Sequence, residues 1–580
     1  MKLLHTISAI LLACTLTFGA DAKSKVEVKP YSVIPEPLEV THHEGSADLA
    51  GFTFVVSEDF DEICHEAAAE LSDKFTAASG KKSRVKAGDG KSKRAVRISK
   101  DPKLAEEEYT LSVTAKGVSI TASDTQGVLY ALQTLTQLLP IEFFEGKQDI
   151  GSLPVPCVEI KDKPRFSYRG VLIDSGRHFF SVEEIKKCLD IMALYHENRF
   201  HWHLSEDQGW RIEIKKYPKL TSIGSVRHGT QVGYDRDSLD GVDYGGFYTQ
   251  DQIRDVVEYA AKRGITVIPE IDLPGHMLSA LAAYPELGCT GGPYEVATTW
   301  GVKKDVLCVG KEETFHFIED VLTEVMDLFP SEYINIGGDE VPKDRWNACP
   351  HCTAKMKELG LYDHDGHTAG QYLQNWVNLR VQAFLNSHGR KLIGWEEILE
   401  GDLPKGATVM SWKGTIENVD PRIWDYDCVM SPRSYMYIDR YQSWEYDREP
   451  LSIGAYLPVE NVYSYEPYDG VPEYGKARIL GVQANLWTEF IGTDEYLEYM
   501  LLPRLAALSE VQWCAEGSKD YERFRTALDQ HAKLYEALGY TYCKYPWGIV
   551  GLPDSEQKAR SHEELRSYVQ ERFGFDIDEQ

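Results

Sequence analysis

Two neighbouring acids, Asp339 and Glu340, follow an apolar run and two glycines in the stretch YINIGGDEV, residues 333–341. Side chains alternate between the two faces of a strand, so adjacent acids can share one pocket only where the strand has ended. Gly337 and Gly338 would let the backbone turn at that point. Paired carboxylates are suited to general acid–base catalysis; their alternative role is to cap the N-terminus of a helix.

Other apolar runs end in the same kinds of residue. Carboxylates accept hydrogen bonds from several hydroxyls at once, and the flat face of an indole stacks on the apolar face of a sugar ring. The composition of these ends therefore favours a carbohydrate pocket, although any one tryptophan is equally compatible with a place in the core. The ends carry Asp174 to His178, His201 to Asp207, Glu270 to His276, Trp395, Trp412, Tyr437 with Asp439, and Trp487 with Glu489.

Eight apolar, β-leaning runs supply these ends, and helical patterns separate several of them. Capping sequences at Ser181–Glu184 and Thr249–Gln252 mark the starts of two helices, while the links after the fifth to seventh runs are less regular. The pattern predicts a (β/α)8 barrel with its catalytic face at the carboxyl ends of the strands. An open doubly wound sheet is the alternative. It needs a Gly-rich phosphate loop after an early strand, and the sequence contains none. The runs are YRGVLIDS, RFHWHLSE, ITVIPEID, YINIGG, KLIGWEEI, TVMSWK, CVMSPRSYMYID and ILGVQANLW.

The chain has 580 residues, which exceeds the size at which a single core normally stops growing. We expect a small α/β domain with a mostly antiparallel sheet over residues 23–160, containing helices at 60–79 and 124–139. The catalytic barrel is predicted over 161–515 and a helical C-terminal tail over 516–580. No convergent catalytic residues are recognised in the first domain.

Residues 1–22 have the features of an export signal. Lys2 is the charged start, Leu3 to Phe18 is apolar, and Ala20-Asp21-Ala22 is a small-residue cleavage site. We therefore expect an exported protein, periplasmic or extracellular, with no stable membrane span. The alternative is a lipoprotein box ending at Cys14, which would carry a lipid anchor.

The chain has 11 cysteines, too few for a disulfide scaffold but enough for one or two bridges in an exported protein. Cys289 and Cys308 flank a Gly-rich loop and can pair across it. Cys349 and Cys352 form a single CxxC. A second ligand pair is absent, so a local disulfide or two free thiols is preferred for it over a zinc or redox half-site.

The net charge is −29, so the average field of the protein would repel a phosphate backbone. The composition thus argues against a nucleic-acid partner. A neutral or cationic substrate fits this balance better.

The chain resembles glycoside hydrolase family 20, the β-N-acetylhexosaminidases, from about residue 34 to residue 513. The matching text includes RGVLIDSGRHF, NRFHWHLSEDQGWRIEIKKYPKLTSIGS, GGFYTQDQIRDVVEYAAKRGITVIPEIDLPGHM, INIGGDEV, GWEEI and NLWTE. The resemblance implies a retaining exo-glycosidase that removes terminal, non-reducing β-linked GlcNAc or GalNAc. It implies no metal or organic cofactor, because the substrate supplies the nucleophile.

The resemblance also implies roles for the paired acids. Glu340 would protonate the glycosidic oxygen and then act as the base for water, which requires a pKa raised by burial and a neighbouring anion. Asp339 would orient and polarise the 2-acetamido group, whose oxygen attacks the anomeric carbon. An oxazolinium forms, and water opens it with retention of configuration.

Further residues match family positions that bind substrate or support the acid. The family usually has two aspartates where this chain has Glu206 and Asp207, and we assign the supporting role to Asp207. The resemblance implies that Arg177 grips the sugar 3- and 4-hydroxyls and that Glu489, with Asp439 nearby, binds the outer hydroxyls. Tyr437 would hydrogen-bond the acetamido oxygen, and Trp395, Trp412 and Trp487 would form the walls around the acetamido group. His276 and Asp207 would support the catalytic acid.

Two other functions stay open at this point. His201 and His203 form an HxH pair that faces one way from its strand, as in metal-dependent barrel hydrolases, although such sites need further ligands on later strands. A non-catalytic glycan-binding protein would need the aromatic residues but not both acids. The preference for GlcNAc or GalNAc, the natural glycan and the oligomeric state are not determined by the sequence.

Overall fold

The computed structural model describes residues 32–88, 92, 94–401, 405–413 and 420–552. The predicted signal peptide with Cys14, and the end of the predicted tail from residue 553, lie outside the described residues. Within the described part of the chain, no helix is both long and apolar enough to cross a membrane.

Eight parallel strands form a closed barrel, which confirms the predicted fold class. Each predicted run contributes one strand. Strand β8 is buried along its whole length, as expected where a parallel sheet is covered on both faces. In chain order the strands are β8 (Tyr168–Asp174), β9 (Arg199–His203), β16 (Thr266–Glu270), β17 (Tyr333–Asn335), β18 (Lys391–Trp395), β19 (Thr408–Ser411), β20 (Asp427–Met430) and β21 (Ile479–Leu486).

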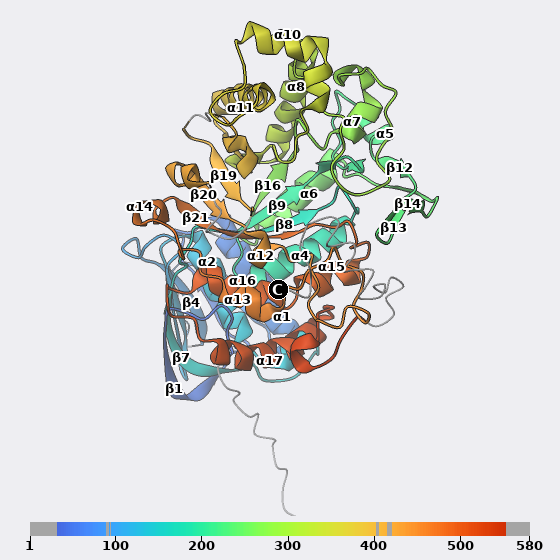
Figure 1. Cartoon of the computed structure of the whole chain (residues 1–580). Helices are drawn as coiled ribbons and strands as arrows, with labels where there is room; N and C mark the ends of the chain where they lie inside the picture. The colour runs from blue at the N-terminus through green and yellow to red at the C-terminus, as the bar shows by residue number, and fades with distance from the viewer. Residues whose placement is uncertain (1–31, 89–91, 93, 402–404, 414–419, 553–580) are drawn as a thin grey trace, which may run out of the picture.

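Helices cover the outside of the barrel (Figure 1). The Ser181 side chain caps α4 by accepting from the Glu184 N–H, and Thr249 with Gln252 forms a complete capping box on α6. Among the described residues, the connections after β18, β19 and β20 contain only short helices, in agreement with the irregular links in the sequence. The helices are α4 (Val182–Leu194), α6 (Gln250–Ala261), α8 (Glu312–Leu328), α11 (Ala369–Ser387), η2 (Glu396–Leu399), η4 (Pro421–Asp425), α12 (Arg433–Met436), α13 (Val459–Ser464), α14 (Glu473–Lys476), α15 (Asp494–Leu501) and α16 (Arg504–Trp513).

Long loops at the carboxyl ends of β9, β16 and β17 carry additional short elements. These elements are β10 (Ser205–Glu206), β11 (Gly209–Trp210), α5 (Lys219–Ser222), β12 (Val226–His228), β13 (Gln231–Val232), β14 (Asp235–Leu239), β15 (Asp243–Gly245), α7 (Leu278–Ala283), η1 (Pro285–Leu287), α9 (Asp344–Ala348) and α10 (Pro350–Glu358).

The N-terminal domain is a seven-stranded sheet packed against helices, in the order β1-β7-β5-β6-β4-β2-β3. Three neighbouring pairs are antiparallel and three are parallel, so the sheet is mixed and the predicted antiparallel character holds for one half of it. The elements are β1 (Glu39–Asp48), β2 (Thr53–Val56), α1 (Glu62–Ser79), β3 (Arg84–Ala87), β4 (Ala95–Lys100), β5 (Tyr109–Thr114), β6 (Gly117–Ala122), α2 (Thr125–Gln137), α3 (Ile141–Phe144) and β7 (Pro154–Asp162).

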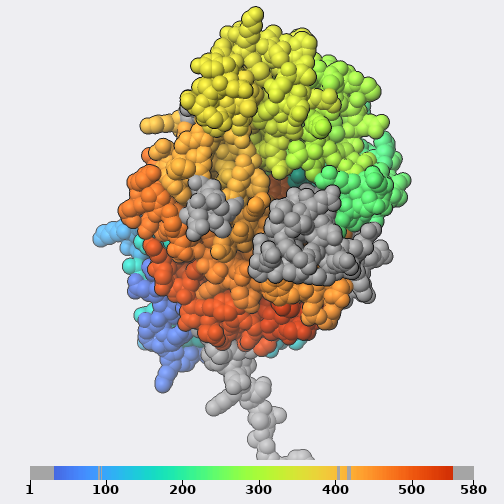
Figure 2. Space-filling model, in the orientation of Figure 1, coloured from blue at the N-terminus to red at the C-terminus, as the bar shows by residue number. Residues whose placement is uncertain are grey.

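The two domains share buried residues. Trp513, at the end of α16, belongs to the hydrophobic core of the N-terminal domain, and its Nε1 donates to Asp162 Oδ1 over 2.9 Å. Arg169 at the start of the barrel pairs with Glu107 of the N-terminal domain at 2.9 Å. Figure 2 shows the N-terminal domain in blue at the lower side of the molecule and the residues around α10 in yellow at the upper end.

The described part of the C-terminal tail contains two helices. It contains α17 (Tyr521–Leu538) and the short η5 (Tyr545–Trp547). Helix α17 packs beside the barrel through buried residues such as Phe524 and Leu528.

Candidate active site

The turn after β17 places both acids at the mouth of the barrel. Gly337 and Gly338 have φ of 62° and 88°, so the backbone turns at the two glycines as expected. A Cβ on Gly337 would lie 1.9 Å from Asp272 Oδ1, so any side chain at this position would force Asp272 to move. Helix α9 begins only at Asp344, with Lys343 as its cap, so the alternative role of the acids as a helix cap is wrong.

The two acids have different environments. Only 16% of the Asp339 side chain is exposed, whereas 44% of the Glu340 side chain is exposed. Burial raises the pKa of Asp339 to about 7; nearby His276 opposes this shift, and the neighbouring carboxylates add to it. Burial was expected to raise the pKa of Glu340, but in the structure Asp339 is the more buried of the two acids. Glu340 faces the open mouth of the site, where it can reach a leaving group.

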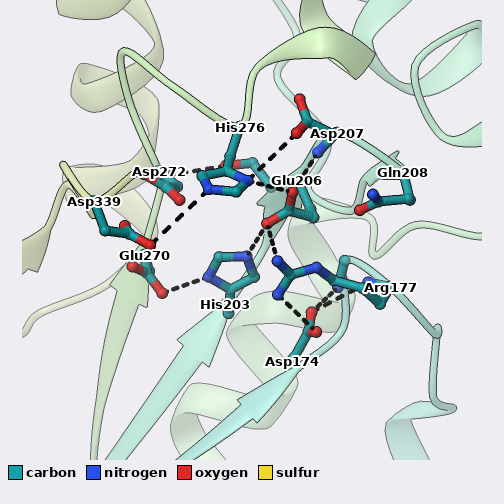
Figure 3. A network of polar contacts seen from close by, with 12 residues as sticks. Asp174, Arg177, His203, Glu206, Asp207, Gln208, Glu270, Asp272, His276 and Asp339 are labelled. Carbon is teal, nitrogen blue, oxygen red and sulfur yellow. Dashed lines mark hydrogen bonds and ion pairs between the residues drawn. The ribbon is translucent and has the colours of Figure 1, made fainter. Parts of the chain in front are cut away.

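His276 lies between Asp339 and a second acidic pair, Glu206 and Asp207 (Figure 3). Its Nε2 is 3.7 Å from Glu340 Oε2 and 4.0 Å from Asp339 Oδ2. Its Nδ1 is 2.8 Å from Glu206 Oε1 and 3.4 Å from Asp207 Oδ2. Burial alone would lower the pKa of His276, but Glu206 and Asp207 outweigh it and hold the pKa well above the usual value, which favours the cationic imidazole.

Glu206 makes more of these contacts than Asp207. Besides His276, it contacts Arg177 Nη2 at 3.1 Å and His203 Nε2 at 3.2 Å, and burial of its charge is outweighed by these cations, which keep its pKa well below normal. Asp207 Oδ1 instead accepts from the Leu278 N–H at 2.9 Å. Both acids thus reach His276, and Glu206 is at the shorter distance, although sequence reasoning gave the supporting role to Asp207.

Arg177 lies just after the carboxyl end of β8 and is held by the carboxylates of Asp174 and Glu206. Its Nη1 is 3.2 Å from Asp174 Oδ2, and its guanidinium carbon lies 5.1 Å from the centre of the Trp487 ring. Burial would lower the pKa of Arg177, but Glu206 and Asp174 raise it well above normal. Its side chain is thus fixed with its charge beside the aromatic wall.

The predicted aromatic residues come together at the ends of four strands. Trp412 stacks on Tyr437 with ring centres 6.0 Å apart and planes at 22°, and Trp487 lies 5.8 Å from Trp395 and 6.4 Å from Tyr437. Trp395 Nε1 donates to Glu270 Oε1 at 2.9 Å. Trp412 and Trp487 are only partly buried, so both have ring surface available to a ligand.

Asp439 and Glu489 form an acidic pair beside this wall. They are 3% and 8% exposed, and burial, reinforced by Glu489, raises the pKa of Asp439 to about 7. Both oxygens of Asp439 and Oε2 of Glu489 have no hydrogen-bond partner among the described residues. Glu489 also lines a cavity of about 1100 Å³, together with Tyr244 and Trp300. Buried acceptors of this kind suit a ligand with several hydroxyls.

The geometry argues against a metal site at His201 and His203. His201 contacts Glu270 at 3.0 Å and Gln483 at 3.0 Å, and His203 is held between Glu206 and Glu270. Both nitrogens of each ring are therefore engaged with other side chains. Neither histidine belongs to a group of three or more potential ligands within the described part of the chain.

Two more acids of the site, Asp272 and Glu270, had no role predicted from the sequence. Asp272 Oδ1 accepts from the Gly338 N–H at 3.2 Å and so holds the turn that carries Asp339. Glu270 accepts from Trp395 and contacts both histidines of β9. Both acids lie in PEIDLPGH, at the end of a predicted strand, and this position indicates a place in the site.

Two family models and several known proteins match this chain. The domain described as "Glycosyl hydrolase family 20, catalytic domain" matches residues 166–516, and "Glycosyl hydrolase family 20, domain 2" matches residues 30–163. A β-hexosaminidase of Porphyromonas gingivalis is 42% identical over 552 residues, covering 93% of this chain and 68% of that protein.

Solved structures match over most of the chain as well. An exo β-N-acetylglucosaminidase of Vibrio harveyi in complex with N-acetylglucosamine is 31% identical with a TM-score of 0.76, covering 90% of this chain and 80% of the other. An N-acetyl-β-hexosaminidase of Streptomyces plicatus in complex with Thio-NAglucal is 30% identical with a TM-score of 0.76, covering 90% and 98%.

Proposed function

The chain belongs to glycosyl hydrolase family 20, and on that basis we propose that Asp339 and Glu340 hydrolyse terminal, non-reducing β-linked N-acetylhexosamine with help from the substrate's own acetamido group. The protein is a glycoside hydrolase, a β-N-acetylhexosaminidase. The proposal concerns which residues carry each step.

In the first step, Glu340 donates its proton to the glycosidic oxygen, and the bond from that oxygen to the anomeric carbon breaks. The acetamido carbonyl oxygen forms the new bond to the anomeric carbon, which gives an oxazolinium and a free alcohol. Asp339 accepts a hydrogen bond from the acetamido N–H, so its charge balances the positive charge that develops on the ring.

In the second step, the Glu340 carboxylate takes a proton from water while the water oxygen attacks the anomeric carbon. The oxazolinium opens, the acetamido group is restored, and the product keeps the β configuration. Glu340 ends protonated and ready for the next cycle.

The observation that supports this proposal most is the contrast between the neighbouring acids. Asp339 is buried beside a histidine, while Glu340, the next residue, is open to the mouth of the barrel. Two carboxylates in different environments are suited to two different roles, one electrostatic and one as a proton carrier.

The residues around the acids fit the parts of the sugar. Tyr437 would donate to the acetamido oxygen, and Trp412 and Trp487 would enclose the acetamido group. Arg177 would donate to the ring hydroxyls, with Glu489 accepting from the outer ones. Trp395 and Asp439 complete this pocket, while His276 with Glu206 and Asp207 holds the acids in place.

The test is hydrolysis of an aryl 2-acetamido-2-deoxy-β-glucoside compared with the plain aryl β-glucoside. We expect fast cleavage of the first and almost none of the second, because only the first carries the nucleophile. Equal rates on both substrates would overturn the proposed role of the acetamido group and favour an ordinary two-carboxylate mechanism.

We also infer from the N-terminal sequence that the protein is exported to the periplasm or the cell exterior. The mass of the mature protein from its native host tests this. Cleavage after Ala22 is expected; an intact Met1 would contradict export by this signal, and a lipid on Cys14 would identify the anchored alternative.

A further inference from the structure

Four cysteines from two separate loops meet at one place in the fold. Cys289 lies after η1 in the loop that follows β16, and Cys308 lies further along the same loop, before α8. Cys349 caps the N-terminus of α10, and Cys352 lies in its first turn. The two pairs are therefore far apart in the sequence and adjacent in space, so the second pair that the CxxC lacks in the sequence is supplied by the fold.

The four sulfur atoms have the spacing of a tetrahedral ligand set. All four lie within 4.8 Å of one another. The Sγ of Cys308 is 3.6 Å from that of Cys349 and 3.6 Å from that of Cys352, and the Sγ of Cys289 is 3.9 Å from that of Cys352. Sulfur atoms bound to one zinc ion at 2.3 Å in a tetrahedron would be about 3.8 Å apart. The thiols are free, and the closest contacts cross between the two loops.

The surrounding chain is built closely around the cluster. Cys308 and Cys352 are fully buried and Cys349 is 3% exposed. A Cβ on Gly310 would lie 2.2 Å from the carbonyl carbon of His351, so the two loops touch backbone to backbone at the CxxC turn. Lys311 donates to the Gly288 carbonyl at 3.1 Å, so the residues just before Cys289 are bonded to those just after Cys308.

We propose that Cys289, Cys308, Cys349 and Cys352 bind one structural zinc ion. Four sulfur ligands with this spacing, three of them buried and Cys289 partly buried, are typical of a closed structural zinc site with no open position for substrate. The positive charge of Lys311 and the N-terminal end of α10 lie beside the thiolates and partly offset their charge. This proposal is independent of the roles assigned to Asp339 and Glu340.

The zinc would join the loop that carries His276 to the loop that carries the paired acids. Leu307, next to Cys308, donates its N–H to the Pro274 carbonyl at 3.0 Å, and the buried Trp346, just before Cys349, donates to the Leu307 carbonyl at 2.9 Å. Through these bonds the metal would fix the position of one catalytic loop relative to the other. Figure 1 shows α7 and α10, which flank the cluster, at the end of the molecule away from the N-terminal sheet.

The first test is the metal content of the purified full-length protein, with the thiols titrated after unfolding in the presence of a chelator. We expect one zinc per chain and all ten cysteines after Cys14 as free thiols. Two disulfides within the cluster would remove four thiols and leave no zinc, and this result would overturn the proposal.

Variants separate the cluster from the other cysteines. Cys308→Ser and Cys352→Ser should lose the zinc and lower the unfolding temperature. Cys428→Ser, which changes an equally buried thiol in β20, should keep one zinc per chain. Full zinc content in both cluster variants would contradict the proposal.

Cobalt gives a result that does not depend on the variants folding. Protein produced with cobalt in place of zinc should show the strong visible absorption of a tetrahedral cobalt–thiolate centre. Cobalt bound without that absorption, or none bound, would overturn the assignment. Gentle removal of the metal should lower kcat more than it changes KM, because the substrate pocket itself contains none of the four cysteines.

Discussion

Nε2 of His276 lies 3.7 Å from Oε2 of Glu340, and both residues have left-handed backbones, with φ of 49° and 48°. Such a backbone costs about 1–3 kcal/mol for a residue other than glycine. The contact therefore joins two strained positions on the loops after β16 and β17. Because strain of this kind persists only where the surroundings enforce it, the relative position of the imidazole and the acid is fixed before substrate arrives.

His276→Asn should move the acidic limb of the kcat/KM profile to higher pH. Burial raises the pKa of Asp339 to about 7 and His276 opposes that shift, so the pKa rises further when the cation is lost. The reaction needs ionised Asp339, and activity is lost as pH falls through its pKa. His228→Asn changes an exposed histidine and should leave the profile unchanged. A profile of the His276 variant that overlays the wild type would show that this histidine has no influence on Asp339.

Glu340→Gln should reduce turnover by about 10²–10⁴-fold on glycans, whose leaving alcohols need a proton. The loss should be much smaller on activated aryl glycosides, which depart as stable phenolates. Glu332→Gln, an exposed acid at the other end of β17, is the matched control and should retain full activity. Equal losses on both substrate types would remove Glu340 from the role of general acid.

Asp339→Asn should reduce activity on both substrate types while making the protein more stable at pH 8. The pKa of Asp339 is about 7 in the folded protein against an ordinary 3.8, so its charge is costly in the folded state and stability falls as pH rises from about 4 to 7. Asparagine has no such charge. Thermal unfolding should therefore give a larger gain at pH 8 than at pH 4; the same gain at both pH values would contradict the raised pKa.

Gly337→Ala should destabilise the protein and reduce activity. The new Cβ would have both an unfavourable φ of 62° and a contact of 1.9 Å with Asp272 Oδ1. Gly360→Ala isolates the first effect, because its φ is 68° and its Cβ would meet nothing within 4 Å. We expect the control to cost about 1 kcal/mol in unfolding free energy and Gly337→Ala to cost more. Equal costs would mean that Asp272 simply moves aside.

The barrel was predictable because each strand is short, apolar and followed by polar residues. The strand pairing of the N-terminal domain was not, because the same alternation of residues serves parallel and antiparallel neighbours. The run FTFVV, for example, is strand β2 as predicted, but only the fold shows that it lies parallel to both β3 and β4.

The individual site residues were visible at the strand ends, but their partners were not. Sequence placed the support of the acid on Asp207, whereas Glu206, one carbon longer, spans the distance to both His276 and Arg177. The exposure of Glu340 likewise depends on how the loops fold over it. The cysteine cluster shows the same limit, since its two halves meet only through the packing of two loops.

The Trp513 indole, supplied by the last barrel helix to the core of the N-terminal domain, makes the chain poorly divisible. A fragment ending near residue 163 would leave a large hole in its own interior, and losses of a buried tryptophan cost about 3–5 kcal/mol. The two domains should therefore melt in one transition and resist limited proteolysis between them. Neither is a module that evolution or an engineer can exchange without also transferring α16.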